Sequence, residues 1–231
     1  MAGKPEQLSV SEKLNDFIQK NRKIMAICLV GVIAAIIILV ASITIRNQLQ
    51  SKALSSVDDF ENRYQVIRPI IMAEDAGAAD GNEELWTLQD DLAVFQKKNS
   101  GYAAARAFAL SAAIYQDRKN WQDAETAWIN AAKSAEKTYF APIAYFNAAV
   151  AAEEQGSSAR ALDLYNKSLE YGTSFPAAAR AQFSIARIQE TMGDKTAALV
   201  SYQILISKWP QDQIWANLAH SRILALTIRD N

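Results

Sequence analysis

The chain has 231 residues, a net charge of −1 and a single cysteine, Cys28. Its 24 basic and 25 acidic residues nearly balance, which argues against a nucleic-acid-binding protein. Glycine (8) and proline (5) are scarce, which favours a helix-rich chain. One cysteine excludes an intramolecular disulfide. We interpret Cys28 as a small apolar filler, with lipid attachment or a redox role as alternatives.

The first predicted element is the segment Ile24–Ile45, which runs for 22 residues without a charge. A helix of this length covers about 33 Å, enough for a bilayer core of roughly 30 Å. We therefore expect an uncleaved transmembrane anchor. A cleaved signal peptide is the alternative, but the apolar run exceeds the usual length of roughly 7–15 residues, and no clear A-x-A site follows it.

Basic residues on the two flanks of this segment predict its orientation. Four precede it and two follow it: Lys13, Lys20, Arg22 and Lys23 against Arg46 and Lys52. The positive-inside rule places a tail of residues 1–23 in the cytoplasm. The remainder, with 18 basic and 22 acidic residues after position 46, then lies outside, in the periplasm of a Gram-negative cell. We expect a single-pass protein of the bacterial inner membrane.

Residues 46–100 predict juxtamembrane helices and a degenerate first repeat. Over residues 49–71, apolar side chains recur at heptad-like steps: Leu49, Ala53, Val57, Phe60, Tyr64, Ile67 and Ile71. A second helix, Glu83 to Lys98, carries Leu85, Leu88, Leu92 and Phe95 at helical spacing. The stripe of the 49–71 helix either packs on the second helix or forms a seam for self-association or for a partner.

Residues 101–210 contain three copies of a pattern with a 37-residue period. Three sets of residues recur at this interval: Lys119, Gly156 and Gly193; Ala124, Ala161 and Ala198; Trp128, Tyr165 and Tyr202. Such a period is typical of stacked helix pairs. Residues 211–231 then predict a capping helix. Its apolar face should cover the last repeat through Ile214, Trp215, Leu218, Ile223, Leu224 and Leu226.

This arrangement resembles the tetratricopeptide repeat (TPR), whose consensus has about 34 residues. The resemblance implies close helix contacts at two sets of alanines: Ala112, Ala149 and Ala186 within repeats, and Ala124, Ala161 and Ala198 between them. Gln182 stands where the family has tryptophan and makes the third repeat the least orthodox. We expect an all-α fold, with a transmembrane helix followed by a TPR-type α-solenoid of antiparallel helix pairs and a C-terminal capping helix.

The resemblance also implies a protein-binding surface on a concave face lined by the first helix of each repeat. The candidate residues are Arg106, Gln116, Ile143, Phe146, Val150, Glu153, Arg180, Phe183, Arg187 and Glu190. Phenylalanine and valine supply an apolar floor, and the arginines supply donors for the carbonyls or carboxylates of a bound chain. Alternatively, the phenylalanines pack only within the array. Ala109 and Ala113 replace the Lys and Asn of family members that clamp a C-terminal carboxylate, so that mode is not expected.

No motif predicts catalysis, a cofactor or a metal site. His220 and Cys28 are the only histidine and cysteine, and they lie too far apart for a usual zinc site. We expect His220 to pack in the core or an interface. The carboxylates of Glu153 and Glu154 point about 100° apart on a helix. Nucleotide-binding and hydrolase motifs are missing, so we expect a non-catalytic protein.

The whole plan resembles the YfgM-like ancillary subunits of the Sec translocon, which have a short tail, one anchor and a periplasmic TPR domain. The stretch from Leu92 to Trp128 carries this likeness. The resemblance implies a scaffold with translocon subunits, periplasmic chaperones or client polypeptides as partners. The alternative function is a structural adaptor of an envelope-assembly or cell-division complex, held through the 49–71 helix.

Overall fold

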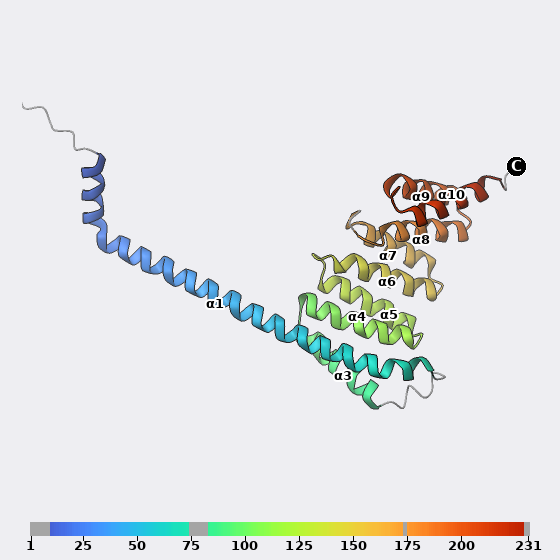
Figure 1. Ribbon diagram of the computed structural model, residues 1–231, viewed down its shortest axis with the longest axis horizontal. Coiled ribbons are helices and arrows are strands. Elements are labelled where there is room, and N and C mark those ends of the chain that lie inside the picture. The colour runs from blue at the N-terminus through green and yellow to red at the C-terminus, as the bar shows by residue number, and fades with distance from the viewer. Residues whose placement is uncertain (1–9, 74–82, 173–174, 229–231) are drawn as a thin grey trace, which may run out of the picture. The chain divides into compact units, whose positions relative to one another are not determined.

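The computed structural model describes residues 10–73, 83–172 and 175–228. The first nine residues of the expected tail and the last three of the expected cap lie outside this range. The chain divides after Lys52 into two parts, each of which is described by itself. Over the described residues it forms nine helices and no strand (Figure 1). The expected all-α class is confirmed.

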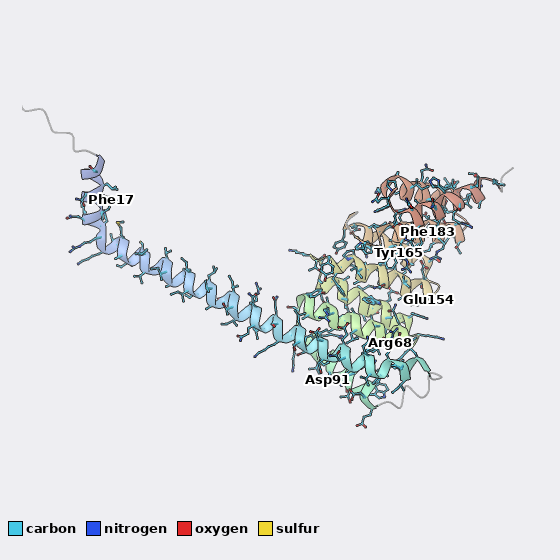
Figure 2. The ribbon with its side chains drawn as sticks, viewed as in Figure 1. Phe17, Arg68, Asp91, Glu154, Tyr165 and Phe183 are labelled. Carbon is cyan, nitrogen blue, oxygen red and sulfur yellow. The ribbon has the colours of Figure 1, made fainter. Side chains whose placement is uncertain are left out.

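The first part consists of the N-terminal portion of α1, which extends from Val10 to Ala73. The expected anchor lies inside this helix, so the boundary at residue 23 is not a helix end. Its most apolar window of 18 residues has a mean hydropathy of 3.2, and no residue of that window is buried. Side chains such as Phe17 stand exposed along it (Figure 2). By length and composition, α1 is able to cross a membrane.

The second part begins with the C-terminal portion of α1 and with α3 (Glu83–Lys98). The α1 stripe is buried from Val57 onward and forms one apolar cluster with α3 and the first repeat. The cluster contains Val57, Tyr64, Ile67, Ile71, Leu85, Leu88, Leu92, Leu110 and Ile114. Of the two interpretations of the 49–71 helix, internal packing therefore describes residues 57–71. A self-association seam over these residues is wrong, since α3 and α4 already cover the side chains, and only Leu49 remains exposed.

Three antiparallel helix pairs follow, stacked one on another in Figure 1. The pairs are α4 (Gly101–Asp117) with α5 (Trp121–Ser134), α6 (Phe140–Glu154) with α7 (Ser158–Leu169), and α8 (Ala178–Thr191) with α9 (Lys195–Lys208). All six alanines expected at close contacts are fully buried. A methyl group is the largest side chain that such an approach accepts, and this explains the strict period at these positions.

Each turn between the two helices of a pair requires a left-handed residue. Gly156 and Gly193 adopt φ values of 74° and 84°, and Lys119 adopts 56° at the equivalent place. Glycine takes this conformation without strain, whereas lysine does not. The next helix then begins with a capped amide in two of the repeats, where Asn120 accepts from the Asp123 N–H and Asp194 from the Ala197 N–H.

The last helix, α10 (Gln213–Ile228), packs on α9 and α8. Ala216, Ala219 and Leu226 are its buried residues, and Trp215 and Ile223 pack partly against the same cluster. Three residues expected to cover the last repeat are instead exposed: Ile214, Leu218 and Leu224. This expectation is corrected, because successive residues turn by about 100° and these three lie on the side opposite to Ala216 and Ala219.

Candidate functional site

The ten candidate residues lie on α4, α6 and α8, the first helices of the three repeats. We call this set the first-helix face. It comprises Arg106 and Gln116 on α4, Ile143, Phe146, Val150 and Glu153 on α6, and Arg180, Phe183, Arg187 and Glu190 on α8. All except Phe146 are exposed or half-buried. The face therefore offers accessible side chains from each repeat.

Phe146 belongs mainly to the core, with 6% of its surface exposed. Its ring meets the rings of Tyr165 and Phe175 at centroid distances of 5.4 and 6.1 Å. The guanidinium of Arg180 covers the remaining side, 5.1 Å from the ring centroid. This cation–π contact holds an exposed arginine over the apolar interior. A partner would therefore meet Arg180 before it meets Phe146.

Phe183 is half-buried and packs partly inside the array. Its ring lies 5.4 Å from Tyr202 and 5.2 Å from Trp215, measured between centroids. In Figure 2, Phe183 and Tyr165 both lie among the stacked helices. Packing within the array thus describes most of Phe146 and part of Phe183. Val150 and Ile143, both half-buried, complete the accessible apolar surface.

Two ion pairs connect α6 with α8 and α8 with α10 across this face, at sequence separations of 34 and 32 residues. Arg187 on α8 donates to Glu153 on α6, and Arg222 on α10 donates to Glu190 on α8. Glu153 and Glu190 stand 37 residues apart and Arg187 and Arg222 stand 35 apart, so the second pair repeats the first only approximately. The other oxygen of Glu153, Oε1, is buried without a partner among the described residues. These pairs link adjacent helices of the array. They also neutralise part of the charge of Arg187, Glu153 and Glu190, so that less of it is available to a ligand.

The N-terminal end of the face is occupied by α1. Arg106 donates to both Asp58 and Glu61, which lie on α1 after Lys52, in the second part of the chain. Arg106 therefore joins the first repeat to the helix before it. The exposed arginines of this face are Arg180 and Arg187, both on α8.

Burial raises the pKa of two tyrosines behind the face. The pKa of Tyr165 is raised by desolvation and by the nearby carboxylate of Glu153. Desolvation and the charge of Glu190 raise the pKa of Tyr202 to about 12. The Tyr202 hydroxyl donates to Glu190 at 3.1 Å. Both phenols therefore stay protonated at neutral pH and act as donors rather than as bases.

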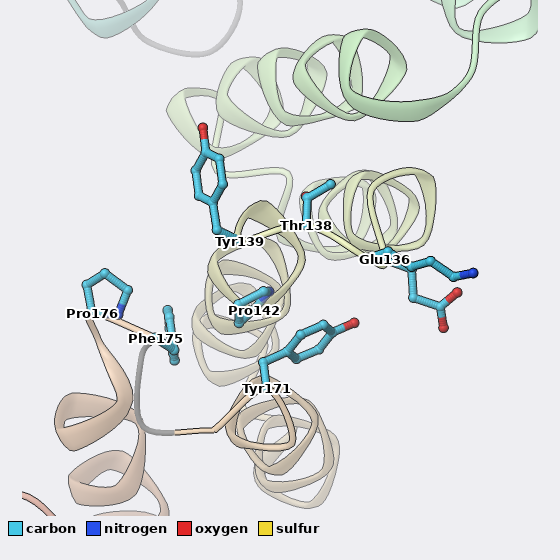
Figure 3. A pocket seen from close by; sticks show the side chains of 8 residues that line it. Glu136, Thr138, Tyr139, Pro142, Tyr171, Phe175 and Pro176 are labelled. Atoms are coloured by element: carbon cyan, nitrogen blue, oxygen red, sulfur yellow. The ribbon is translucent and has the colours of Figure 1, made fainter.

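A cavity at the ends of the helices was not foreseen from the sequence. It has a volume of about 440 Å³ and lies between the loop before α6 and the segment after α7, lined by Glu136, Lys137, Thr138, Tyr139, Pro142, Tyr171, Phe175 and Pro176. Figure 3 shows Pro142 between Tyr139 and Tyr171. The Tyr139 hydroxyl lies 2.9 Å from that of Tyr102, its equivalent one repeat earlier. That 37-residue spacing was a signal available in the sequence.

Within residues 10–73, 83–172 and 175–228, no cluster of three His, Cys, Asp or Glu side chains has metal-site geometry. His220, expected in the core or an interface, is exposed on α10, so core packing is wrong for this residue. What the first-helix face offers is a mixture of arginine, carboxylate and apolar surface, which suits binding of a polypeptide.

Comparison with known proteins supports the repeat assignment. The profile of the tetratricopeptide repeat family matches residues 180–212, which span the third repeat, the one that contains Gln182. Gln182 is buried there and donates to the Ser201 carbonyl. A TPR repeat-containing protein of Treponema pallidum (strain Nichols) is 27% identical over 226 residues, 94% of either chain. No solved structure matches this chain.

Proposed function

We propose that the protein is a membrane-anchored scaffold that binds other polypeptides on its first-helix face. The observation that carries this proposal is the pairing of exposed arginines with half-buried apolar side chains on α6 and α8. Arg180 and Arg187 are exposed on α8, where Phe183 is half-buried, and Val150 is half-buried on α6. Arginine and aromatic residues dominate the binding energy of many protein interfaces. TPR proteins in general bind other proteins, and the match of the TPR profile to residues 180–212 supports this role.

Anchoring is the second element of the proposal. The segment Ile24–Ile45 spans the inner membrane of a bacterium, with residues 1–23 in the cytoplasm and the repeats in the periplasm. The length and hydropathy of α1 support the span, and the basic residues of the N-terminal flank support the orientation. A fusion of an enzyme active only in the periplasm after residue 231 tests this topology, and activity of a cytoplasm-dependent reporter at the same site would reverse it.

We place the scaffold near the Sec translocon, where it assists secreted or envelope proteins together with periplasmic chaperones. The support is the likeness of the whole plan to the YfgM-like subunits. The Treponema pallidum relative aligns over 94% of either chain, and its description states only that it contains TPR repeats. The structural-adaptor alternative relied on an accessible 49–71 seam. Burial of that seam from Val57 onward removes its support.

A pull-down from detergent extract tests the binding face. The variant Phe183→Ala with Arg187→Ala should lose the partners that the wild-type chain recovers, which we expect to be translocon subunits, chaperones and secreted chains. A matched control, Val200→Ala with Lys208→Ala, changes one apolar and one basic side chain on the exposed side of α9 and should retain them.

Phe183 also packs against Tyr202 and Trp215, so its replacement could disturb the fold as well as the binding surface. A second variant that leaves these contacts intact is therefore needed to interpret a loss of binding. Arg180→Glu meets this need, because the guanidinium is exposed. It should weaken binding while the helical circular dichroism stays that of the wild type and the melting temperature falls only slightly, through loss of the cation–π contact with Phe146. Retention of all partners by both variants would show that the first-helix face is not the binding surface.

A further inference from the structure

The outward face of α10 carries an apolar stripe that the repeat array does not cover. Ile214, Leu218, Leu224 and Ile228 are exposed by 71%, 43%, 60% and 62%. We call these four residues, with the small or uncharged residues Asn217, Ser221 and Ala225 between them, the α10 stripe. At 3.6 residues per turn its seven members lie within an arc of about 120°. No residue of the stripe is charged.

The stripe is symmetric about Ser221. Leu218 and Leu224 stand three residues on either side of it, and Asn217 and Ala225 stand four residues on either side. Ile214 and Ile228 stand seven residues on either side. Steps of three, four and seven keep side chains on one side of a helix. Read from either end, the stripe therefore presents the same order of large and small residues.

Such a stripe is complementary to itself in an antiparallel pair. A two-fold axis through Ser221 would place Ile214 of one copy opposite Ile228 of the other, and Leu218 opposite Leu224. An isologous interface needs this self-complementarity, because each copy contributes the same patch. The small side chain of Ser221 lies where the helices cross and permits close approach. Arg222 points away, toward Glu190 of its own chain.

We propose that the α10 stripe is a self-association surface, and that its occupant is the α10 stripe of a second copy of this chain. The absence of charge along it favours a like copy over a charged partner, since no like charges meet across the axis. From Ile214 to Ile228 the seam is about 21 Å long. One helix pair buries less than the roughly 800 Å² per partner of a stable interface, so the dimer is weak in dilute solution.

Site-directed disulfide formation tests the position of the axis. In a full-length Cys28→Ser background in detergent micelles, Ser221→Cys should form a covalent dimer under mild oxidation. Helix axes about 8–10 Å apart bring axis-facing Cα atoms within about 3.5–5.5 Å, which overlaps the disulfide range of about 4.4–6.8 Å. Asn217→Cys is the matched control: its two copies would lie about 12 Å apart along the helices and should stay monomeric.

The double variant Asn217→Cys with Ala225→Cys should restore the cross-link, because these positions face each other across the axis. If Asn217→Cys alone cross-links as fast as Ser221→Cys, or if Ser221→Cys yields no dimer at any concentration, the proposed pairing is wrong. This experiment reports on α10 only, so its failure would leave binding at the first-helix face untouched.

A charge introduced into the stripe gives a second, independent readout. Leu218→Glu should raise the dissociation constant of the dimer at least about tenfold in sedimentation velocity at varied protein concentration, since it places two unpaired carboxylates in an apolar seam. Val200→Glu introduces the same charge at an exposed apolar residue of α9 outside the stripe and should leave the constant unchanged. Equal effects of both variants would indicate general apolar adhesion and overturn the proposal.

Discussion

The two ends of the repeat array close in different ways. At the N-terminal end, the stripe of α1 is buried against α3 and α4, and arginines secure it: Arg63 donates to Glu84 and Asp91, and Arg106 donates to Asp58 and Glu61. At the C-terminal end, α10 buries two alanines and one leucine and keeps four large apolar side chains outside. An apolar helix at the end of an array is thus not by itself a cap.

The largest expected difference in unfolding free energy compares one leucine at each end of the array. Leu88 is fully buried in the cluster that α1, α3 and α4 share. Leu88→Ala should lower the unfolding free energy by about 3 kcal/mol, because it removes apolar contacts and leaves a cavity. Leu218→Ala, on the exposed stripe, should cost less than about 0.5 kcal/mol at concentrations where the chain is monomeric. Urea unfolding of both variants measures this, and equal losses would contradict the difference between the ends.

The two faces of α10 give the next largest contrast. Ala219 is fully buried against the last repeat, and Ala225 is exposed. Ala219→Leu should destabilise the chain by about 2 kcal/mol through overpacking, while Ala225→Leu should be close to neutral. Thermal melting of the two variants tests the orientation of α10, and the reverse order would require the helix to be rotated.

The raised pKa of Tyr202, which α10 covers, predicts that the folded chain loses stability at alkaline pH. The pKa of Tyr202 rises from 10.0 to about 12 in the folded chain, chiefly through burial. A raised pKa means that the unfolded chain loses this proton first, so the stabilising contribution is complete below pH 10 and is lost as the pH rises toward 12. Tyr202→Phe should reduce the loss of unfolding free energy across that window by on the order of 1 kcal/mol. An unchanged pH profile would contradict burial of this hydroxyl.

The smallest expected difference in unfolding free energy compares two arginines, Arg222 at the C-terminal end and Arg106 at the N-terminal end, each of which pairs with a carboxylate on an adjacent helix. Arg222 faces Glu190, whose side chain is 17% exposed, whereas Arg106 faces Asp58 and Glu61, which are 60% and 51% exposed. Because solvent screens the second set more, Arg222→Ala should cost about 1 kcal/mol and Arg106→Ala about 0.5 kcal/mol or less. Denaturation in low and high salt measures both, and a larger loss for Arg106→Ala would reverse this ranking.

The sequence was sufficient for the repeats because their close contacts tolerate one residue type. Ala124, Ala161 and Ala198 recur since no larger side chain fits, and Gly156 and Gly193 recur since the turn needs a left-handed residue. The stripe over residues 57–71 was equally readable as a buried face. What remained open was the partner of that face, because spacing shows that a helix has an apolar side but not which neighbour covers it.

The orientation of α10 was missed for a related reason. Its large apolar residues, among them Ile214 and Leu218, give a stronger pattern than Ala216 and Ala219, although the alanines form the buried contact. Ion pairs were also beyond reach: the sequence offered Glu153 and Arg187 as separate binding residues, and only their positions on adjacent helices reveal that they pair. The cavity beside Tyr139 arises from loops that lie far apart in the sequence.

Site-specific photo-cross-linking tests the central claim, that the first-helix face holds other polypeptides. A benzophenone amino acid at Val150, half-buried on α6, should give adducts with secreted or envelope proteins in intact cells. The same probe at Asn166, exposed on α7, should give only background. Adducts at Val150 alone are the predicted result; equal adducts at both positions, or none at Val150, would contradict the account.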